Sequence, residues 1–348
     1  MFKSKIKGLF VDLSEFSILA ARTSAYTLPI EVEEIAELPL LADVQAEDVR
    51  AFLAQLVDFN GAEYYVSRCG VYPRERFLHY YESSSVNKLK DLNFLTEVLE
   101  SKFKVDPATT SVSILDARRG SNFDPEAGLT KQIIFCGGSV SILQEVQDQL
   151  LSYGLYPDRL ELSSMTTLGG VCDYARFNQI MAPILCVELT SQHTNVFIVN
   201  NAQIALTSSL SFGLDDIYLL LQRELSLKDE ASARKLFYSN TFDFAEIGSK
   251  LLRRIIKELQ ATAGLYEVQT GLGIACIFLS ALPQNLSWIA KSMSDSLGIE
   301  IMRPDMEAWL QGLNIKFADG VDVSNLGSRW FSVFSLMAEF QSREGVSE

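Results

Sequence analysis

Short apolar runs separated by turn-forming residues mark the beginning of the chain. The runs at 7–12, 16–23 and 31–37 have the length and spacing of strands. The acidic stretch at 46–58 has helical spacing, and AEYYVSRCG at 62–70 alternates as a pleated segment should. The pattern therefore predicts a three-strand meander, a helix and a further strand.

The same order returns in the second half of the chain. Apolar runs at 183–188, 193–199 and 203–210 predict another three-strand meander, and helical patterns follow it. A chain of 348 residues is too long for one ordinary core, and its length is typical of two or three domains. The repeated meander therefore predicts two related domains.

Between the two meanders the pattern changes to alternating helices and strands, which we interpret as a compact α+β insertion. Helices are predicted at 90–103 and 139–153, and the second is amphipathic. Strands are expected at TSVSILDAR (110–118), KQIIFCGG (131–138) and a short run near 158–162. A loop rich in Gly, Pro and Asp, RGSNFDPEAGLT (119–130), connects the first two.

Each meander carries a carboxylate where its first strand ends, followed by a leucine and a hydroxyl residue. The two sequences are Asp12-Leu13-Ser14 and Glu188-Leu189-Thr190. Asp, Ser and Thr side chains commonly satisfy backbone groups at turns. The motif predicts two polar turns at matching places in the two domains.

Charge and hydropathy exclude several classes of partner. Lys and Arg total 30 against 44 Asp and Glu, which gives a net charge of −14. Because a phosphate backbone would be repelled, we expect no nucleic-acid binding. No uncharged apolar stretch reaches the roughly 18 residues of a membrane span. Asp12 and Glu15 also interrupt the N-terminal apolar run, so we expect a soluble cytoplasmic protein without direct membrane insertion.

Residues for common catalytic chemistry are sparse. The two histidines, His79 and His193, lie near no Gly-x-Ser-x-Gly elbow, and the chain has no Gly-x-x-x-x-Gly-Lys loop. The five cysteines are widely spaced and mostly set in apolar strands, so we expect reduced core residues. No clustered Cys/His set for zinc appears, and no metal site is predicted.

The order of these segments resembles the actin-like superfamily, in particular the bacterial branch that includes FtsA and the PilM-like proteins of type IV pilus assembly. VDLSEFSILAARTS (11–24) lies where that family has its first phosphate loop. The later matches are VELTSQHTNVFIVNNAQIALTSSLSFGLDDI (187–217, second phosphate loop and a glycine-containing helix start), IACIFLSALPQNLSWIAKSMSDSLGIEIMRPD (274–305, adenosine segment) and DVSNLGSRWFSVFSLMAEF (322–340, final helix).

This resemblance implies an α/β, actin-like (ribonuclease H-like) fold whose two domains close around a nucleotide. It places the first actin-like domain at 1–85 and 325–348 and the second at 166–324. The α+β insertion at 86–165 takes the place of the extra subdomain that FtsA and PilM carry in their first domain.

The chain departs from the family at the positions that hold a nucleotide. The family's phosphate loops have glycine after the carboxylate, which lets backbone N–H groups approach the phosphate. Leu13 and Leu189 occupy those places here, and each must either fill the phosphate position or turn into the core. In the adenosine segment, the run Ser280 to Pro283 replaces a glycine turn.

The polar residues that remain would form a vestigial nucleotide cleft, which we expect to be unoccupied. They are Asp12, Ser14, Ser17, Glu188, Thr190, Ser191, Gly213 and Ser280. No catalytic residue and no cofactor are therefore expected. The alternative is an ATP-binding actin-like ATPase of pilus assembly or cell division with atypical phosphate loops, which would need ATP and Mg²⁺.

The resemblance also implies a partner. PilM-like proteins are cytoplasmic scaffolds that bind the N-terminal tail of a single-pass inner-membrane pilus assembly protein in a groove between the first domain and its insertion. The same role in a type II secretion-like machine, and association between copies of the chain, remain open. Since aromatic side chains dominate peptide anchoring, the expected groove residues are Tyr80, Tyr81, Phe94 and Phe103, although some of them must be core.

Overall fold

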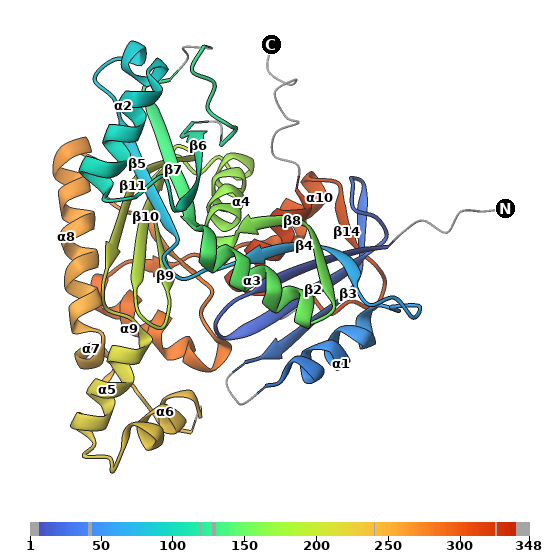
Figure 1. Ribbon diagram of the computed structural model, residues 1–348. Coiled ribbons are helices and arrows are strands. Elements are labelled where there is room, and N and C mark those ends of the chain that lie inside the picture. Colours follow the sequence, from blue (N-terminus) through green and yellow to red (C-terminus); the bar gives the residue numbers. More distant parts are fainter. Residues whose placement is uncertain are drawn as a thin grey trace.

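The N-terminal meander forms one half of the first of two main sheets in the computed structural model (Figure 1). The structure describes residues 7–40, 44–118, 120–126, 130–239, 241–323 and 326–338. Across the first sheet the order is β14 (Ile315–Phe317), β3 (Ile30–Pro39), β2 (Ser17–Thr23), β1 (Gly8–Leu13), β4 (Tyr65–Val71) and β8 (Leu155–Leu162). β1 pairs antiparallel with β2 and parallel with β4.

The second meander forms a sheet of the same design. Its order is β11 (Gln203–Leu210), β10 (Thr194–Asn200), β9 (Ile184–Leu189), β12 (Cys276–Ser280) and β13 (Glu300–Ile301). β9 pairs antiparallel with β10 and parallel with β12, as β1 does with β2 and β4. The two predicted meanders therefore open two sheets with equivalent strand orders.

Helices cover both sheets and fill the space between them. α1 (Ala46–Leu56) and α3 (Val140–Ser152) pack on the outer face of the first sheet. α4 (Ser163–Phe177) and α11 (Phe331–Met337) lie between the sheets, in a core shared by both. The outer face of the second sheet is covered by α5 (Leu214–Glu224), α6 (Glu230–Tyr238), α7 (Gly248–Leu251), α8 (Arg253–Thr270) and α9 (Ser287–Leu297).

Because both faces of each sheet are covered, β1 and β9 are buried along their whole length, as the continuous apolar runs predict. The shared core is tightened by Trp309 of α10 (Met306–Gly312), whose ring stacks on Phe331 at 4.8 Å between centroids. The indole nitrogen of Trp309 also donates a hydrogen bond to Asp173 of α4, 2.9 Å long.

The insertion is a third sheet, ordered β5 (Phe77–Glu82), β7 (Gln132–Ser139) and β6 (Thr110–Asp116). The helix expected at 90–103 is divided into α2 (Leu92–Glu97) and a π-helical turn at Val98–Lys102, which pack on Ile133 and Phe135. The backbone N–H of Tyr80 in β5 donates to the hydroxyl of Thr207 in β11, at 3.0 Å. The insertion thus also lies against the second sheet.

The strand pairing places the limits of the insertion elsewhere than at 86 and 165. β5 lies before residue 86 yet belongs to the inserted sheet, whereas α3 and β8 lie before 165 yet belong to the first domain. The chain also returns to the first sheet earlier than residue 325, because β14 pairs with β3. Parts of the expected terminal segments, residues 1–6 and 339–348, lie outside the described residues.

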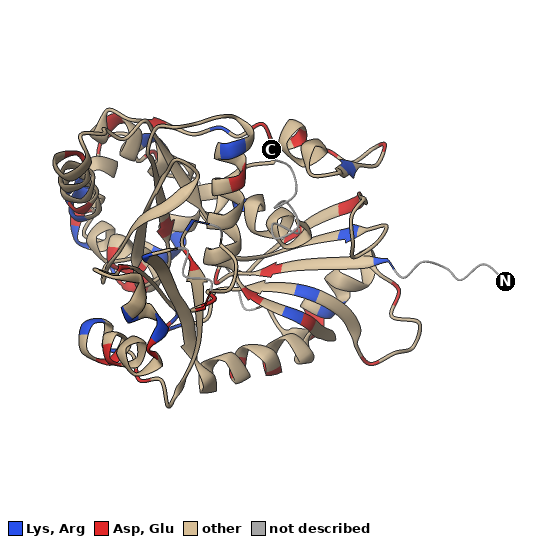
Figure 2. Cartoon of the chain, turned by 90° about the horizontal axis from the view of Figure 1, so that it is seen from above, with Lys and Arg blue, Asp and Glu red and all other residues tan. Residues whose placement is uncertain are grey.

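Acidic and basic residues are interspersed over the elements of both halves when the molecule is seen from above (Figure 2). Within the described residues, no helix combines the length and the hydrophobicity needed to cross a bilayer.

Candidate functional site

The two strand-end carboxylates occupy equivalent places in the two sheets. Asp12 is the second-last residue of β1 and lies opposite Gly70 of β4, and Glu188 is the second-last residue of β9 and lies opposite Ser280 of β12. Both side chains are buried and face the layer that contains α4. The sequence motif therefore marks one site, shared by two domains.

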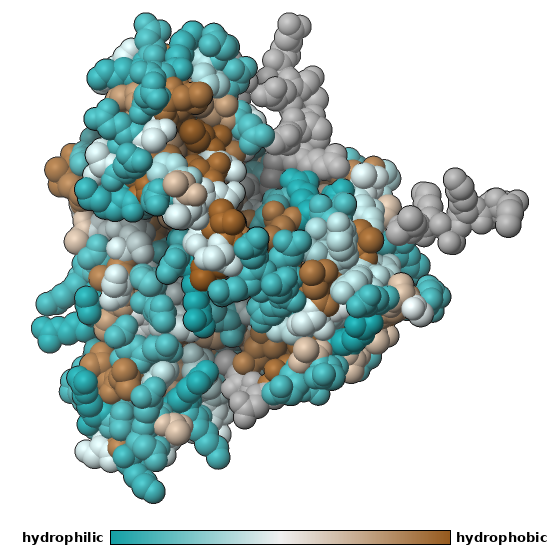
Figure 3. All heavy atoms as spheres, viewed as in Figure 1, coloured by the Kyte–Doolittle hydropathy of each residue, from teal (hydrophilic) through white to brown (hydrophobic). Residues whose placement is uncertain are grey.

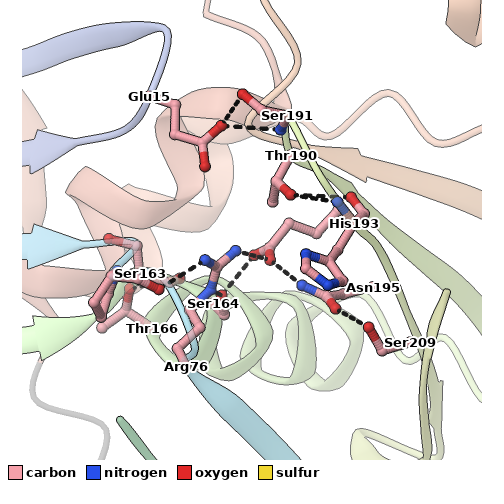
Figure 4. Close-up of polar contacts among 12 residues, drawn as sticks. Glu15, Arg76, Ser163, Ser164, Thr166, Thr190, Ser191, His193, Asn195 and Ser209 are labelled. Atoms are coloured by element: carbon pink, nitrogen blue, oxygen red, sulfur yellow. Dashed lines mark hydrogen bonds and ion pairs between the residues drawn. The ribbon is translucent and has the colours of Figure 1, made fainter. Parts of the chain in front are cut away.

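The first turn of α4 holds both carboxylates. The hydroxyl of Ser163 donates to Asp12 Oδ1, and the hydroxyl of the next residue, Ser164, donates to Glu188 Oε2 at 2.6 Å (Figure 4). Negative charge is also favoured at a helix N-terminus by the helix dipole. A Cβ added at Gly70 would lie 2.5 Å from the Ser163 hydroxyl, so a glycine at this place leaves room for the contact with Asp12.

Arg76 fills the space beside Glu188. Its guanidinium forms an ion pair with Glu188 Oε1 and donates from Nε to the hydroxyl of Ser164 at 2.9 Å (Figure 4). The amide of Asn195 donates to the same carboxylate at 2.8 Å, and Ser209 donates to Asn195 at 2.8 Å. Glu188 is thereby neutralised and hydrogen-bonded by the protein's own side chains.

Among the described residues, no cationic side chain is hydrogen-bonded to Asp12. Burial raises the pKa of Asp12 from 3.8 to about 7, and the negative charge of Glu188 adds to the rise. Hydrogen bonds from Ser163 and from Ser332 of α11 lower the pKa and offset part of this effect. The Asp12 carboxyl therefore gains and loses its proton near neutral pH.

The hydroxyls of the two turns are used by the turns themselves. Ser14 Oγ accepts from the backbone N–H of Ser17 at 3.0 Å and donates to the Ser17 carbonyl at 2.9 Å. Thr190 Oγ1 does the same with His193, at 3.0 and 3.1 Å. The backbone N–H groups of Ser14 and Thr190 bond to the same two carbonyls, at 3.0 and 2.9 Å. These donors are already occupied within their own hairpins.

Leu13 and Leu189 both turn into the core, the second of the two alternatives that the sequence allowed. Leu13 is buried with Val49 and Leu53 under α1, and Leu189 is buried on the outer side of the second sheet with Phe212. Neither fills the cleft. Because a leucine takes the place of glycine in each turn, neither turn has the residue that would let backbone N–H groups approach a phosphate.

The turn of the first domain is also fastened to the second domain. The carboxylate of Glu15 accepts from the backbone N–H of Ser191 at 2.9 Å and from the Ser191 hydroxyl (Figure 4). Phe16 is buried in the second domain's core, and its ring lies 6.4 Å from that of Tyr238 between centroids. The two turns are thus joined directly, by the Glu15 carboxylate and by the Phe16 ring.

Gly213 and Ser280 complete the residues predicted for the cleft. Gly213 caps α5, and a Cβ there would lie 2.4 Å from the Ser191 carbonyl oxygen, so this close approach requires glycine. Ser280 ends β12 and is followed by Ala281, which has a positive φ of 56° without being glycine. Leu282 packs against the second domain's core.

The four aromatic residues predicted to bind a peptide are half-buried and pack against the cores of the protein. Tyr81 packs against Phe94 and Phe103, with ring centroids 6.4 and 6.3 Å apart, in the core of the insertion. Tyr80 packs against the core shared by the two sheets. A cavity of about 990 Å³ does lie between the first domain and the insertion, but these four described residues do not line it.

That cavity is lined by β6 and β7 of the insertion, by α3, β8, α4 and α11, and by Ala202 and Ile204 at the start of β11. Its apolar lining includes Leu115, Ile134, Cys136, Val140, Leu143 and Met165, and arginines at its border are Arg118, Arg159 and Arg176. Val140 remains 43% exposed there. In the sequence, this surface could have been found from the apolar residues 140 and 143, which lie one turn apart on the amphipathic helix predicted at 139–153.

No protein-family profile matches this chain, and no curated protein sequence matches it. Among solved structures, it is similar to one described as the PilM-PilN type IV pilus biogenesis complex, with 13% identity, a TM-score of 0.68, and coverage of 97% of this chain and 99% of that chain. This similarity and the matching strand orders confirm the predicted fold, that of a PilM-like, actin-like protein.

Two weaker similarities were also found. A Bacteroides thetaiotaomicron protein of unknown function with an actin-like ATPase fold is 11% identical, with a TM-score of 0.47, over 90% of this chain and 98% of that one. The cytoplasmic domain of EpsL, an inner-membrane component of the Vibrio cholerae type II secretion system, is 14% identical, with a TM-score of 0.36, over 64% and 76%. At these levels of identity, the comparisons extend to fold alone.

Proposed function

We propose that this chain is a non-catalytic cytoplasmic scaffold of a type IV pilus or type II secretion-like assembly platform. The observation that carries the proposal is the occupied cleft: Arg76, Ser163 and Ser164 satisfy the two carboxylates that an actin-like ATPase would place beside its nucleotide. A protein that fills its own cleft in this way works by binding a partner, not by hydrolysing ATP. No cofactor is required.

The proposed partner is the N-terminal cytoplasmic tail of a single-pass inner-membrane pilus assembly protein, which would hold the scaffold at the membrane. The likeness to a PilM-PilN complex supports a protein partner of this kind. The cavity supports a short peptide as its form, because about 990 Å³ lies at the upper end of the volumes that enclose drug-sized ligands.

The cavity lining suits an extended peptide with apolar anchors. Leu115 and Ile134 are cross-strand neighbours on the inserted sheet, and Val140 and Leu143 lie one helical turn apart on α3. Polar residues line the same cavity, and a mixture of apolar and polar side chains is typical of peptide grooves. The proposed anchoring residues therefore shift from Tyr80, Tyr81, Phe94 and Phe103 to the cavity lining.

Calorimetric titration with a synthetic copy of the tail of the pilus-type membrane protein encoded beside this chain tests the proposal. We expect micromolar affinity, about −8 kcal/mol. Val140→Glu and Leu143→Glu should each weaken binding by roughly tenfold or more, because a charge would be buried under the peptide. Leu92→Glu is the matched control, because Leu92 is 68% exposed and does not line the cavity.

Equal binding by all three variants would place the peptide outside the cavity, and no binding by the unaltered chain would remove the proposed partner.

A further inference from the structure

Helix α8 runs along the outer side of the second sheet with one face buried and the opposite face bare. Ile255 and Leu259 on its inner face are fully buried. On the outer face, Leu265 is 54% exposed and Val268 is 85% exposed, and Leu272, just after the helix, is 44% exposed. Brown and tan spheres mark this edge of the molecule (Figure 3). A helix of a monomeric protein would normally present polar residues there.

The outer face of α8 also has the spacing of a helix-pairing seam. Lys257, Ala261, Gly264 and Val268 follow one another at intervals of four, three and four residues, the alternation of the a and d positions of a coiled coil. A Cβ built at Gly264 meets nothing within 4 Å, so the space above the centre of the helix is open. Small side chains at 261 and 264 would let a second helix approach closely.

Charge along α8 selects the direction of that second helix. The basic residues Arg253, Arg254 and Lys257 lie in its N-terminal half, and Glu267 lies near its C-terminus. An antiparallel copy of α8 with its two-fold axis near residues 262 and 263 would place Ala261 opposite Gly264. It would also place Lys257 opposite Val268 and next to Glu267, within reach of its carboxylate, and symmetry makes this Lys257–Glu267 pair twice. A parallel copy would instead set like charges against each other.

We propose that α8 is a self-association surface, on which a second copy of this chain docks its own α8 in the antiparallel direction. The contact is isologous, with apolar side chains at the centre and an opposite charge pair at each end. The helix has 18 residues, a length of about 27 Å. One helix pair buries less surface than an obligate dimer does, so the association is reversible and depends on concentration.

Sedimentation of the full chain from low concentration up to about 100 µM tests the proposal, and a reversible monomer–dimer equilibrium is expected. Lys257→Glu and Glu267→Lys should each weaken the dimer by roughly tenfold, because each change creates two like-charge contacts. Mixing the two variants should restore dimers, since every 257–267 contact in the mixed pair again joins opposite charges. The double variant Lys257→Glu, Glu267→Lys should also dimerise.

Val268→Lys should abolish the dimer, because it sets a second cation opposite Lys257, and Lys235→Glu, a charge reversal at an exposed site on α6, should leave it unchanged. Unaltered melting temperatures would show that all variants fold. A chain that stays monomeric overturns the proposal. So does a dimer that survives Val268→Lys, or single charge variants that fail to pair when mixed.

Discussion

Ser163 and Ser164 are consecutive in the chain, yet their hydroxyls bind carboxylates from two different sheets, Asp12 and Glu188. In a two-domain actin-like fold, these carboxylates stand on opposite sides of the nucleotide cleft. Here the first turn of one helix holds them together. The two sheets are therefore linked at this point by side chains of the protein.

Mg-ATP at about 1 mM should cause no thermal shift and no hydrolysis above background. A ligand of such weak affinity gains roughly −4 kcal/mol, which a few charge-assisted hydrogen bonds of roughly 1.5 to 3 kcal/mol each would have to supply. The N–H groups of Ser14 and Thr190, which would have to donate them, are bonded within their hairpins. Differential scanning fluorimetry gives the answer. A shift of several degrees that disappears in an Asp12→Ala, Glu188→Ala double variant would establish the ATPase alternative.

Arg76→Met should destabilise the protein by about 3 to 5 kcal/mol, because Glu188 would keep a buried charge without its cation. Adding Glu188→Gln should recover part of this loss, since the amide oxygen in the Oε1 position can still accept from Asn195 and the amide nitrogen in the Oε2 position can donate to the Ser164 hydroxyl. Urea denaturation measures both values. Lys291→Ala is the control, because its pair with Asp295 is exposed and should change stability by about 0.5 kcal/mol or less. An equally small effect of Arg76→Met would contradict the role assigned to this arginine.

The contribution of Asp12 to the free energy of unfolding should fall as pH rises from about 4 to about 7. The pKa of Asp12 is raised from 3.8 to about 7 in the folded state, so the folded protein binds more protons than the unfolded chain in this window. Asp12 therefore favours folding at low pH and opposes it as it ionises. Relative to Asp12→Asn, the unaltered protein should lose roughly 2 to 3 kcal/mol between about pH 5 and pH 8. Parallel stability curves for the two proteins would show that Asp12 has an ordinary pKa.

Phe16→Ala should cost about 3 to 5 kcal/mol, because it leaves a cavity in the core of the second domain. Because Phe16 comes from the first domain, the change should also loosen the contact between Glu15 and Ser191. Hydrogen exchange at residues 190–193 should then be faster, in addition to the loss of stability. The exposed substitution Leu92→Ala provides the comparison. Unchanged exchange in the Phe16→Ala protein would mean that the turn is held by other contacts.

Much of the fold could be predicted from the sequence because its signals are local. The buried strands β1 (Gly8–Leu13) and β9 (Ile184–Leu189) are apolar runs apart from the carboxylate near the end of each, and each is followed by a hairpin of the expected length. The limits of the insertion were wrong because strand pairing is not local. The sequence of β5 is typical of an aromatic surface segment, but β5 pairs with β7 of the insertion. The position of β8 in the sequence indicates the insertion, but β8 pairs with β4 of the first sheet.

The site was predictable only where one motif defined it. Asp12 and Glu188 were identified from their repeated context, and their hydroxyl neighbours Ser14 and Thr190 proved to cap the turns. Arg76 was missed because it lies 112 residues from Glu188 and carries no periodic signal. Tyr81 and Phe94 pack against the core of the insertion and do not line the cavity, which the sequence could not indicate, because an aromatic residue has the same sequence signal whether it packs on a core or lines a groove.

Helix α4 belongs to two sites at once. Its first turn holds Asp12 and Glu188, and its next residues, Met165 and Thr166, line the cavity proposed for the peptide. By thermodynamic reciprocity, an occupant of the cavity that changes the position of this turn must change the proton affinity of Asp12, and the proton must change the affinity of the occupant by the same factor. Proton uptake or release during the titration, measured in buffers of different ionisation heat, reports this coupling directly.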